Sequence, residues 1–451
     1  MKITVVGAGY VGLVSGACFA EFGFDVTCVD KDSSKVDALN KGIVPIYEPG
    51  LDSLIHQGVK AKRLTFTTDL STAVKTSDIV MIAVGTPTRR GDGHADLTYV
   101  YQAATEIANS IGDSYTVVVT KSTVPVGASR QVAEIIKKTR PELVEGVSFD
   151  VASNPEFLRE GSAISDFMRP DRVIIGTNNA KASEVLQKLY RPLYLIETPI
   201  VSTTLETSEL IKYAANGFLA LKISFINQMA DLCEKSGGDV QVLAKGIGLD
   251  KRIGKKFLHA GPGYGGSCFP KDTRALNQIA KTYGVQCSLV DNVIRYNEER
   301  KLDMAQRIIQ ATSSCGTNKK VAVLGLTFKP NTDDLREAPS LTIIQELLKN
   351  GFEVSAYDPL YYDGCERLNY AIDCEKSFAK VRFANSTYDA VTDAGCVVIL
   401  TEWNEFRALD MGKIIKLMDS SKKPLFMDFR NIYNPKDMTN FNYFGLGIGV
   451  T

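Results

Sequence analysis

A cysteine lies inside a glycine-rich stretch of the chain, "GPGYGGSCFPKD", which runs from Gly261 to Asp272. Glycines allow a backbone to come close to a ligand, and Lys271 is near enough in the sequence to favour a thiolate at Cys268. A thiolate is a nucleophile suited to covalent catalysis. Most of the nine cysteines are expected to be small buried apolar residues. The surroundings of Cys268 make it the exception and a candidate nucleophile.

A lysine and an asparagine share one face of an expected helix. The pattern from about 203 to 237 is helical, and Lys212 and Asn216 are four residues apart within it. Their neighbours are mostly apolar. Such a lysine either extends along the apolar surface toward water or has a functional role, and the pattern leaves both open.

The N-terminal segment predicts a dinucleotide site. A β-branched strand leads into Gly7-x-Gly9-x-x-Gly12, a helix follows to about Glu21, and a second strand ends at Asp30. The glycines let the backbone approach a pyrophosphate at the start of the helix. Asp30 can accept hydrogen bonds from a ribose diol and would repel a 2′-phosphate, so the segment favours NAD over NADP.

Three further apolar strands are expected, and each ends in polar residues. They deliver Thr86 with Pro87, Ser122 with Thr123, and Glu156 to the carboxyl edge of a parallel sheet, where ligands of such folds bind. The alternative is that these residues serve only as turns and caps.

A second strand–loop–helix–strand unit begins at Lys319 and ends at Asp358. Its loop carries Lys329 and Arg336 in place of the glycines, which suits a phosphate-bearing ligand. We therefore predict an α/β protein with two Rossmann-like, doubly wound parallel-sheet domains joined by a central helical region. The expected ranges are 1–200, 201–315 and 316–451, with a second helical stretch at about 273–312.

Composition excludes several classes of protein. The chain has 451 residues with 52 basic and 52 acidic side chains, whereas nucleic-acid binders usually carry a basic excess. No apolar run reaches the ~18 residues that span a membrane. There is no Cys-x-x-Cys pair and there are three histidines, so no metal site is expected. The odd cysteine count suits a cytoplasmic protein with reduced thiols.

Seven motifs in order resemble the UDP-glucose/GDP-mannose dehydrogenase family, in particular its bacterial UDP-glucose 6-dehydrogenases. They are "GAGYVG", "GTPT", "KSTVPVG", "NPEFLREG", "ELIKYAANGFLALKISFINQ", "GPGYGGSCFPKD" and "FKPNTDDLREAPS". The resemblance covers nearly the whole chain. It implies NAD-dependent oxidation of the C6 alcohol of UDP-glucose to a carboxylate, without a metal, by a homodimer whose long central helices pack together.

The resemblance also implies roles for residues. A thiolate at Cys268 would add to the intermediate aldehyde, and the thiohemiacetal could then donate a second hydride and become a thioester. Lys212 would stabilise the developing oxyanion, and Asn216 would hold the same oxygen or an ordered water. Glu156 would activate the water that hydrolyses the thioester. Thr123 and Asp272 would position that water and tune Lys212.

The same resemblance divides the remaining contacts between cofactor and substrate. The expected cofactor-binding residues are Gly7, Gly9, Tyr10, Val11, Gly12, Asp30, Lys35, Thr86, Pro87, Thr123, Glu160, Lys271 and Arg336. The expected substrate-binding residues are Glu156, Phe157, Leu158, Arg159, Glu160, Lys212, Asn216, Arg252, Phe257, Leu258, His259, Ala260, Gly261, Gly265, Phe328 and Lys329. His259 is expected to contribute only its backbone. The chain reads "DFRN" where relatives usually have "DGRN", so Phe429 stands in the glycine place and Arg430 is left unassigned.

Three other functions remain open. A sister enzyme would act on UDP-N-acetylmannosamine or GDP-mannose. A β-hydroxyacid dehydrogenase would join one Rossmann domain to helices through a lysine and would need no cysteine. A non-enzymatic sensor of NAD or nucleotide sugars could keep the glycines and lose the chemistry.

Overall fold

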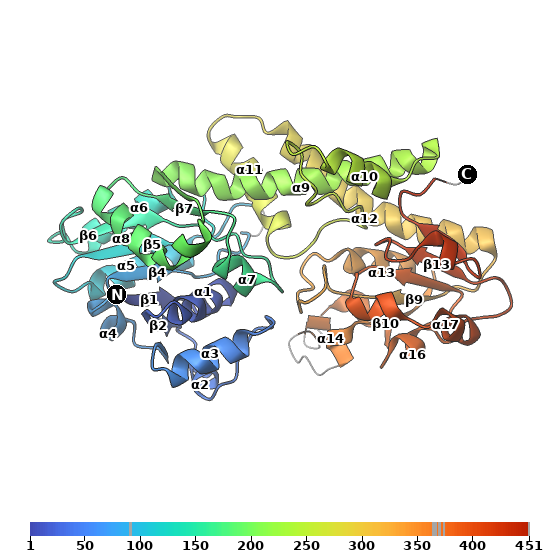
Figure 1. Ribbon diagram of the computed structural model, residues 1–451, viewed down its shortest axis with the longest axis horizontal. Helices are drawn as coiled ribbons and strands as arrows, with labels where there is room; N and C mark the ends of the chain where they lie inside the picture. Colours follow the sequence, from blue (N-terminus) through green and yellow to red (C-terminus); the bar gives the residue numbers. More distant parts are fainter. Residues whose placement is uncertain (90–92, 363–367, 369–370, 373–374, 450–451) are drawn as a thin grey trace. The chain divides into compact units, whose positions relative to one another are not determined.

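The computed structural model describes all residues except 90–92, 363–367, 369–370, 373–374 and 450–451 (Figure 1). The chain divides into two compact units. Unit 1 comprises Met1–Ala215 and Gln278–Val285, and unit 2 comprises Asn216–Asn277 and Gln286–Thr451. Two helices, α9 (Leu205–Ser236) and α11 (Phe269–Thr282), have residues in both units.

Unit 1 is built on an eight-stranded sheet. Its strands are β1 (Lys2–Val6), β2 (Asp25–Val29), β3 (Leu64–Thr67), β4 (Ile79–Ile82), β5 (Thr116–Thr120), β6 (Phe149–Ser153), β7 (Val173–Gly176) and β8 (Ile200–Thr203). The spatial order is β3-β2-β1-β4-β5-β6-β7-β8. The strands pair in parallel except at β6–β7, where Ser153 faces Gly176 in an antiparallel pairing. The last two strands thus form an antiparallel edge on a sheet that is otherwise parallel.

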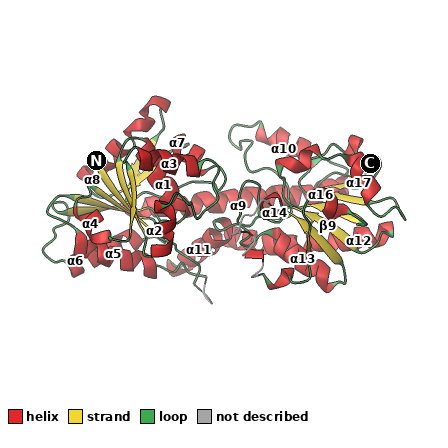
Figure 2. Cartoon of the chain, turned by 90° about the horizontal axis from the view of Figure 1, so that it is seen from below, coloured by secondary structure: helices red, strands yellow, loops and turns green. Residues whose placement is uncertain are grey.

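Helices cover both faces of this sheet because its central strands are apolar on both sides (Figure 2). One core packs beneath helices α1 (Tyr10–Glu21), α2 (Ser33–Asn40), α3 (Leu51–Lys60), α7 (Ala163–Met168) and α8 (Ala180–Leu189). The opposite core packs beneath helices α4 (Leu70–Lys75), α5 (Thr98–Ser110) and α6 (Ala128–Thr139). A 3-10 helix, η1 (Arg191–Ile196), precedes β8. The first helix begins at Tyr10 and ends at Glu21, as the glycine spacing predicts.

Unit 2 contains a six-stranded parallel sheet. Its strands are β9 (Lys320–Leu324), β10 (Glu353–Tyr357), β11 (Arg382–Phe383), β12 (Cys396–Ile399), β13 (Leu425–Asp428) and β14 (Asn442–Gly445), in the order β11-β10-β9-β12-β13-β14. The helices around it are α12 (Ser288–Cys315), α13 (Pro339–Lys349), α14 (Pro359–Tyr362), α16 (Thr387–Val391), α17 (Met411–Leu417), η2 (Lys376–Phe378), η3 (Asn404–Ala408) and η4 (Pro435–Asp437). Helices flank both faces of this sheet as well (Figure 2).

The helical region differs from the sequence-based expectation at two places. The stretch expected at 273–312 is two helices, α11 and α12, because Gly284 takes a left-handed conformation with φ +69° and ends α11. A further helix, α10 (Val240–Gly248), was not expected. The expected helix at about 203–237 corresponds to α9. The prediction of two Rossmann-like sheets joined by helices is confirmed.

In the part of the chain that the structure describes, no helix combines the length and the apolar composition needed to cross a lipid bilayer.

Candidate active site

The glycine turn of unit 1 has the geometry of a pyrophosphate cradle. A Cβ on Gly7 would lie 2.7 Å from the carbonyl oxygen of Ala83, and one on Gly12 would lie 1.8 Å from that of Gly7, so neither position tolerates a side chain. A Cβ on Gly9 would meet nothing within 4 Å, which leaves open space above the start of α1. This space is where a pyrophosphate rests on the helix N-terminus.

Asp30 holds this turn from the end of β2. Its Oδ2 accepts the N–H of Ala8 at 2.8 Å and the ammonium of Lys35 at 2.9 Å. Its side chain is 14% exposed, so one edge of the carboxylate can reach a ribose diol. The turn and the carboxylate together fit NAD. When it is bound, the nicotinamide ring of NAD⁺ would accept a hydride.

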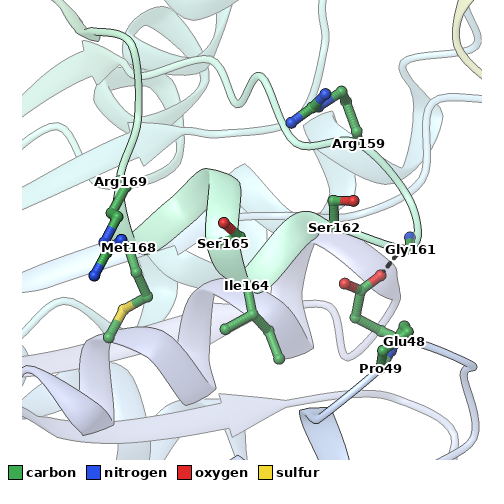
Figure 3. Close-up of a pocket in the computed structure, with 9 residues that line it drawn as sticks. All are labelled: Glu48, Pro49, Arg159, Gly161, Ser162, Ile164, Ser165, Met168 and Arg169. Atoms are coloured by element: carbon green, nitrogen blue, oxygen red, sulfur yellow. Dashed lines mark hydrogen bonds between the residues drawn. The ribbon is translucent and has the colours of Figure 1, made fainter.

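A buried glutamate joins this turn to the loop after β6. Glu48 accepts a hydrogen bond from the Tyr10 hydroxyl, and it accepts the N–H groups of Gly161 and Ala163 at 2.6 and 2.7 Å. Figure 3 shows the bond to Gly161 beside a pocket of about 460 Å³, which Arg159 and Arg169 also line. The loop that carries the sequence-predicted Glu160 is therefore fixed to the start of α1.

The centre of the candidate chemistry in unit 1 is an ion pair. Lys212, on α9, donates to Glu156 Oε1 at 2.9 Å and to the Glu156 carbonyl oxygen at 2.6 Å. The two side chains are 4% and 7% exposed. Burial raises the pKa of Glu156, but the Lys212 ammonium and the N–H of Leu158 outweigh it, so the pKa lies below its ordinary value. Glu156 is accordingly a carboxylate at neutral pH.

Sequence reasoning missed a third charged group beside this pair. Lys121, at the end of β5, is 3% exposed and donates to Asn154 Oδ1 at 3.1 Å. Burial lowers the pKa of Lys121 to about 8, an effect that nearby Glu156 opposes and Lys212 reinforces. The only sequence signal was its place in "TKSTVP", one residue before Ser122 at the end of an apolar strand.

Three further sequence-predicted positions of unit 1 have defined contacts. The Thr86 hydroxyl donates to the Thr123 carbonyl oxygen at 2.9 Å, so two strand ends meet there as expected. The Phe157 ring lies under the Arg172 guanidinium at 3.6 Å. Arg159 is exposed and forms an ion pair with Asp166 at 2.6 Å.

In unit 2, Cys268 directly precedes α11. The N–H of Asp272 donates to the Cys268 carbonyl oxygen at 2.8 Å, which starts the helix at the cysteine. Cys268 is half-buried, and its Sγ lies 3.7 Å from Ser267 Oγ. A helix N-terminus stabilises a nearby negative charge, which suits a thiolate.

The Asp272 carboxylate gathers two other sequence-predicted residues. Asn216 Nδ2 donates to its Oδ2 at 2.6 Å, and Lys271 Nζ lies 2.7 Å from its Oδ1. Asp272 is 1% exposed. Asn216 is thus bonded to the first turn of α11, a contact that the sequence did not predict.

The loop before Cys268 is closely packed. Leu258 and Ala260 are buried, and Phe257, at φ +64°, packs edge-on against Phe269 at 6.0 Å. A Cβ on Gly265 would lie 2.5 Å from the Glu337 carbonyl oxygen. His259 and Arg252 are exposed, and Arg252 pairs with Asp250 at 2.6 Å.

Two arginines of the second sheet domain differ in their setting. Arg336 is exposed and pairs with Asp334 at 2.8 Å. Arg430, unassigned from the sequence, donates to the Leu400 carbonyl oxygen at 2.7 Å and lies so close to Gly261 that a Cβ there would be 2.8 Å from Nη1. Phe429, which replaces the usual glycine, is fully buried. Arg430 therefore lies beside Gly261, in the loop before Cys268, despite the substitution.

Asp358 corresponds in position to Asp30 but is fully buried. Its Oδ2 accepts the N–H of Leu326 at 2.8 Å and the indole N–H of Trp403 at 3.2 Å. The Asp358 carboxylate is thus covered by protein groups, whereas that of Asp30 is partly exposed. Lys329 Nζ, nearby in sequence, lies 5.4 Å from the Phe328 ring.

The sequence-predicted residues fall into two sets by unit. Unit 1 holds Gly7, Gly9, Tyr10, Val11, Gly12, Asp30, Lys35, Thr86, Pro87, Thr123, Glu156, Phe157, Leu158, Arg159, Glu160 and Lys212. Unit 2 holds Asn216, Arg252, Phe257, Leu258, His259, Ala260, Gly261, Gly265, Cys268, Lys271, Asp272, Phe328, Lys329 and Arg336. Within the described residues, no cluster of three or more His, Cys, Asp or Glu side chains could hold a metal ion.

Three family models match the chain in succession. They are the NAD binding domain of the UDP-glucose/GDP-mannose dehydrogenase family over residues 1–194, its central domain over 206–299 and its UDP binding domain over 322–435. The chain belongs to the UDP-glucose/GDP-mannose dehydrogenase family. The resemblance inferred from the seven motifs is confirmed, as is NAD as the cofactor of the first domain.

Full-length relatives of this dehydrogenase chain are similar to it throughout. The UDP-glucose 6-dehydrogenase of Rhizobium meliloti (strain 1021) is 54% identical over 451 residues, covering 99% of each chain. The UDP-glucose 6-dehydrogenase TuaD of Bacillus subtilis (strain 168) is 46% identical over 99% of this chain and 93% of the relative.

Solved structures of other dehydrogenases have the same fold. The UDP-glucose dehydrogenase of Pyrobaculum islandicum superposes with a TM-score of 0.87 at 34% identity, covering 100% of this chain and 98% of that one. The UDP-D-ManNAc dehydrogenase of Pyrococcus horikoshii gives a TM-score of 0.84 at 29% identity over 99% of both chains.

Proposed function

We propose that the chain oxidises UDP-glucose to UDP-glucuronate, with NAD⁺ as the acceptor of two successive hydrides. The observation that carries this proposal is the full-length similarity to UDP-glucose 6-dehydrogenases, at 54% identity over 451 residues. One alcohol, two NAD⁺ and one water become one carboxylate, two NADH and three protons. We also propose that the functional segments are those expected at 1–200, 201–315 and 316–451.

The proposed first half of the reaction converts the alcohol to an aldehyde. Lys212, a buried cation, stabilises the alkoxide that forms as the C6 hydroxyl releases its proton to solvent and C6 gives a hydride to NAD⁺. The aldehyde then accepts the Cys268 thiolate, forming a C–S bond and a new oxyanion. Asn216, whose amide is oriented by Asp272, is proposed to hold this oxygen.

The proposed second half releases the product. The thiohemiacetal carbon gives up a second hydride and becomes a thioester. Glu156, ionised beside Lys212, accepts a proton from the water that attacks the thioester, and the C–S bond breaks to restore the thiol. Thr123 is proposed to position that water. Asp30 and Lys35 are proposed to bind the adenosine ribose, and Lys329 the UDP moiety.

The proposed homodimer has support from α9. Phe218, Phe225 and Leu232 recur every seven residues along this helix, and they are 62%, 45% and 57% exposed. An exposed apolar stripe of this spacing suits packing against a second long helix. Phe225→Lys should convert the dimer to a monomer in light-scattering measurements, and an unchanged mass would contradict this interface.

The proposed location is the cytoplasm. All seven cysteines in the described residues are thiols rather than disulfides, which agrees with a reducing compartment.

The yield of NADH per sugar tests the activity. With limiting UDP-glucose, the wild type should form two NADH per sugar, and UDP-N-acetylmannosamine and GDP-mannose should be poor substrates. A single NADH with a free aldehyde would contradict the thioester route. Preference for UDP-N-acetylmannosamine would instead favour the activity named for the Pyrococcus horikoshii protein. Binding of both ligands without turnover would identify a sensor.

A further inference from the structure

We propose that Asn227, Asn297 and Arg300 are positioning residues that hold the cysteine loop, Gly261–Cys268, in its reactive conformation. These three side chains are named here the loop clamp. None of them belongs to the expected site. The inference rests on the proposed function in taking Cys268 as the nucleophile.

Each clamp residue bonds the backbone of the loop. Asn227, on α9, accepts the N–H of Gly261 at 2.8 Å. Asn297, on α12, accepts the N–H of Tyr264 at 2.8 Å and donates to the carbonyl oxygen of the same residue at 3.0 Å. Arg300 Nε donates to the Gly261 carbonyl oxygen at 3.1 Å. Both backbone groups of both loop residues are thus bonded to side chains of two long helices.

Burial gives these bonds their strength. Asn227, Asn297 and Arg300 are 1%, 2% and 2% exposed, so water cannot replace a lost partner. An unsatisfied buried group then bears its full desolvation cost. If one clamp side chain is removed, the original loop conformation would leave a buried N–H without a hydrogen bond. The loop is therefore expected to adopt a different conformation.

The buried guanidinium also argues against a purely stabilising role. Arg300 pairs with Asp231 at 2.6 Å, yet its Nη2 is buried without a hydrogen-bond partner among the described residues. Apolar residues of similar volume often stabilise such positions better than buried ions do. The arginine instead provides a directed bond to the loop at Gly261.

The other side of the loop is fixed to the second sheet domain. The N–H of Gly266 donates to the Arg336 carbonyl oxygen at 2.7 Å. A Cβ on Gly266 would lie 2.7 Å from the Phe328 ring, so the loop backbone packs closely against this ring. The clamp and this contact hold the residues that precede Cys268 from two sides, and misplacement of a reacting group by about 1 Å can cost a hundredfold in rate.

The test compares Asn227→Leu with Asn227→Asp and Asn277→Leu. The leucine removes the acceptor for Gly261, whereas aspartate keeps an acceptor oxygen at the same place. Asn277 is 9% exposed, and its amide donates to Asp291 at 2.9 Å, so Asn277→Leu controls for the loss of a buried amide outside the loop.

Two measurements give the outcome. Hydrogen–deuterium exchange of the ligand-free protein should rise at least tenfold in peptides covering 258–268 for Asn227→Leu, and stay near wild type for the other two variants. With UDP-glucose, kcat should fall about 10- to 100-fold for Asn227→Leu, KM for NAD⁺ should stay within about twofold, and Asn227→Asp should recover most of kcat.

Other results would overturn the proposal. If Asn227→Leu matched Asn277→Leu in both loop exchange and kcat, the clamp would not position the loop. If kcat fell without faster loop exchange, or if Asn227→Asp failed to recover it, the positioning role would also be rejected. Should Asn227→Leu not fold, Arg300→Lys, which keeps the charge but loses the Nε bond to Gly261, is judged by the same criteria.

Failure of the proposed function would look different. A wild type that forms no NADH from any nucleotide sugar refutes the proposed function, while loop exchange still decides whether the clamp holds the loop.

Discussion

Lys212 Nζ donates to both the side chain and the main-chain carbonyl of Glu156, at 2.9 and 2.6 Å. One ammonium therefore fixes the carboxylate and its backbone together, in a site where both side chains are almost fully buried. In such surroundings, removing one ion leaves the other without compensation, and the cost of that is usually about 3–5 kcal/mol. The pair is thus proposed to act in catalysis, and the stability of the fold also depends on it.

Glu156→Gln should destabilise the protein in a pH-dependent way. Because the folded pKa of Glu156 lies below its ordinary value, its charge stabilises the fold above the unfolded pKa of ~4.3, and this contribution disappears as the pH falls through the folded pKa. The difference in free energy of unfolding between wild type and variant should be largest at pH 7, stay nearly constant down to about pH 4, and shrink only as the pH falls further. Urea denaturation at several pH values checks this, with exposed Glu184→Gln as the control. A difference that stayed constant below about pH 4 as well would contradict the ionised pair.

Lys121→Met should stabilise the protein most at neutral pH. The folded pKa of about 8 is below the ordinary 10.5, so the folded state releases its proton first and wild-type stability rises with pH between those values. Below pH 8 the buried charge costs wild type on the order of 3 kcal/mol relative to deprotonated lysine. The advantage of methionine over lysine should therefore decline between pH 8 and pH 10. Thermal unfolding in that range measures it, and an advantage that grows with pH would refute the assignment.

Cys268→Ser should stop turnover before the thioester forms. A hydroxyl is a weak nucleophile at neutral pH, so steady-state NADH formation should fall at least a thousandfold, with a bound intermediate detectable by mass spectrometry. Cys287→Ser, at another half-buried cysteine, is the matched control and should keep wild-type rates. Full activity in Cys268→Ser would remove the nucleophile role.

Asp30→Asn should weaken NAD more than UDP-glucose. The amide loses the charge that accepts both the Ala8 N–H and a ribose hydroxyl, and charge-assisted bonds are worth about 1.5–3 kcal/mol. The expected rise in KM for NAD⁺ is about 10- to 100-fold, with KM for UDP-glucose within about threefold. Equal losses for both ligands, measured by steady-state kinetics, would argue against a ribose contact.

Local patterns predicted much of this protein. The glycine spacing of Gly7, Gly9 and Gly12 dictates a tight turn and helix start, so α1 has its expected bounds. The helical stretch expected at 273–312 is interrupted at Gly284. The sequence did not reveal this break because apolar periodicity continues on both sides of the glycine, and the break is visible only in its positive φ. A glycine within a helical pattern does not by itself say which conformation it takes.

The shared sheet edge of Thr86 and Thr123 was predicted, but individual side-chain contacts between distant segments could not be. Lys121 meets Asn154 only because β5 and β6 are neighbours, with Thr120 opposite Ser153. Arg430 lies close to Gly261, although the two residues are far apart in the sequence. The residues are ordinary in their local sequence, and their significance comes from the sheet order.

Trp403 is the chain's single tryptophan, and it lies 7% exposed with its indole bonded to Asp358. Its ultraviolet emission is therefore an intrinsic optical probe of the second sheet domain, free of background from any other indole. Unfolding of that domain, which exposes the buried indole, can be followed by this signal in unlabelled protein.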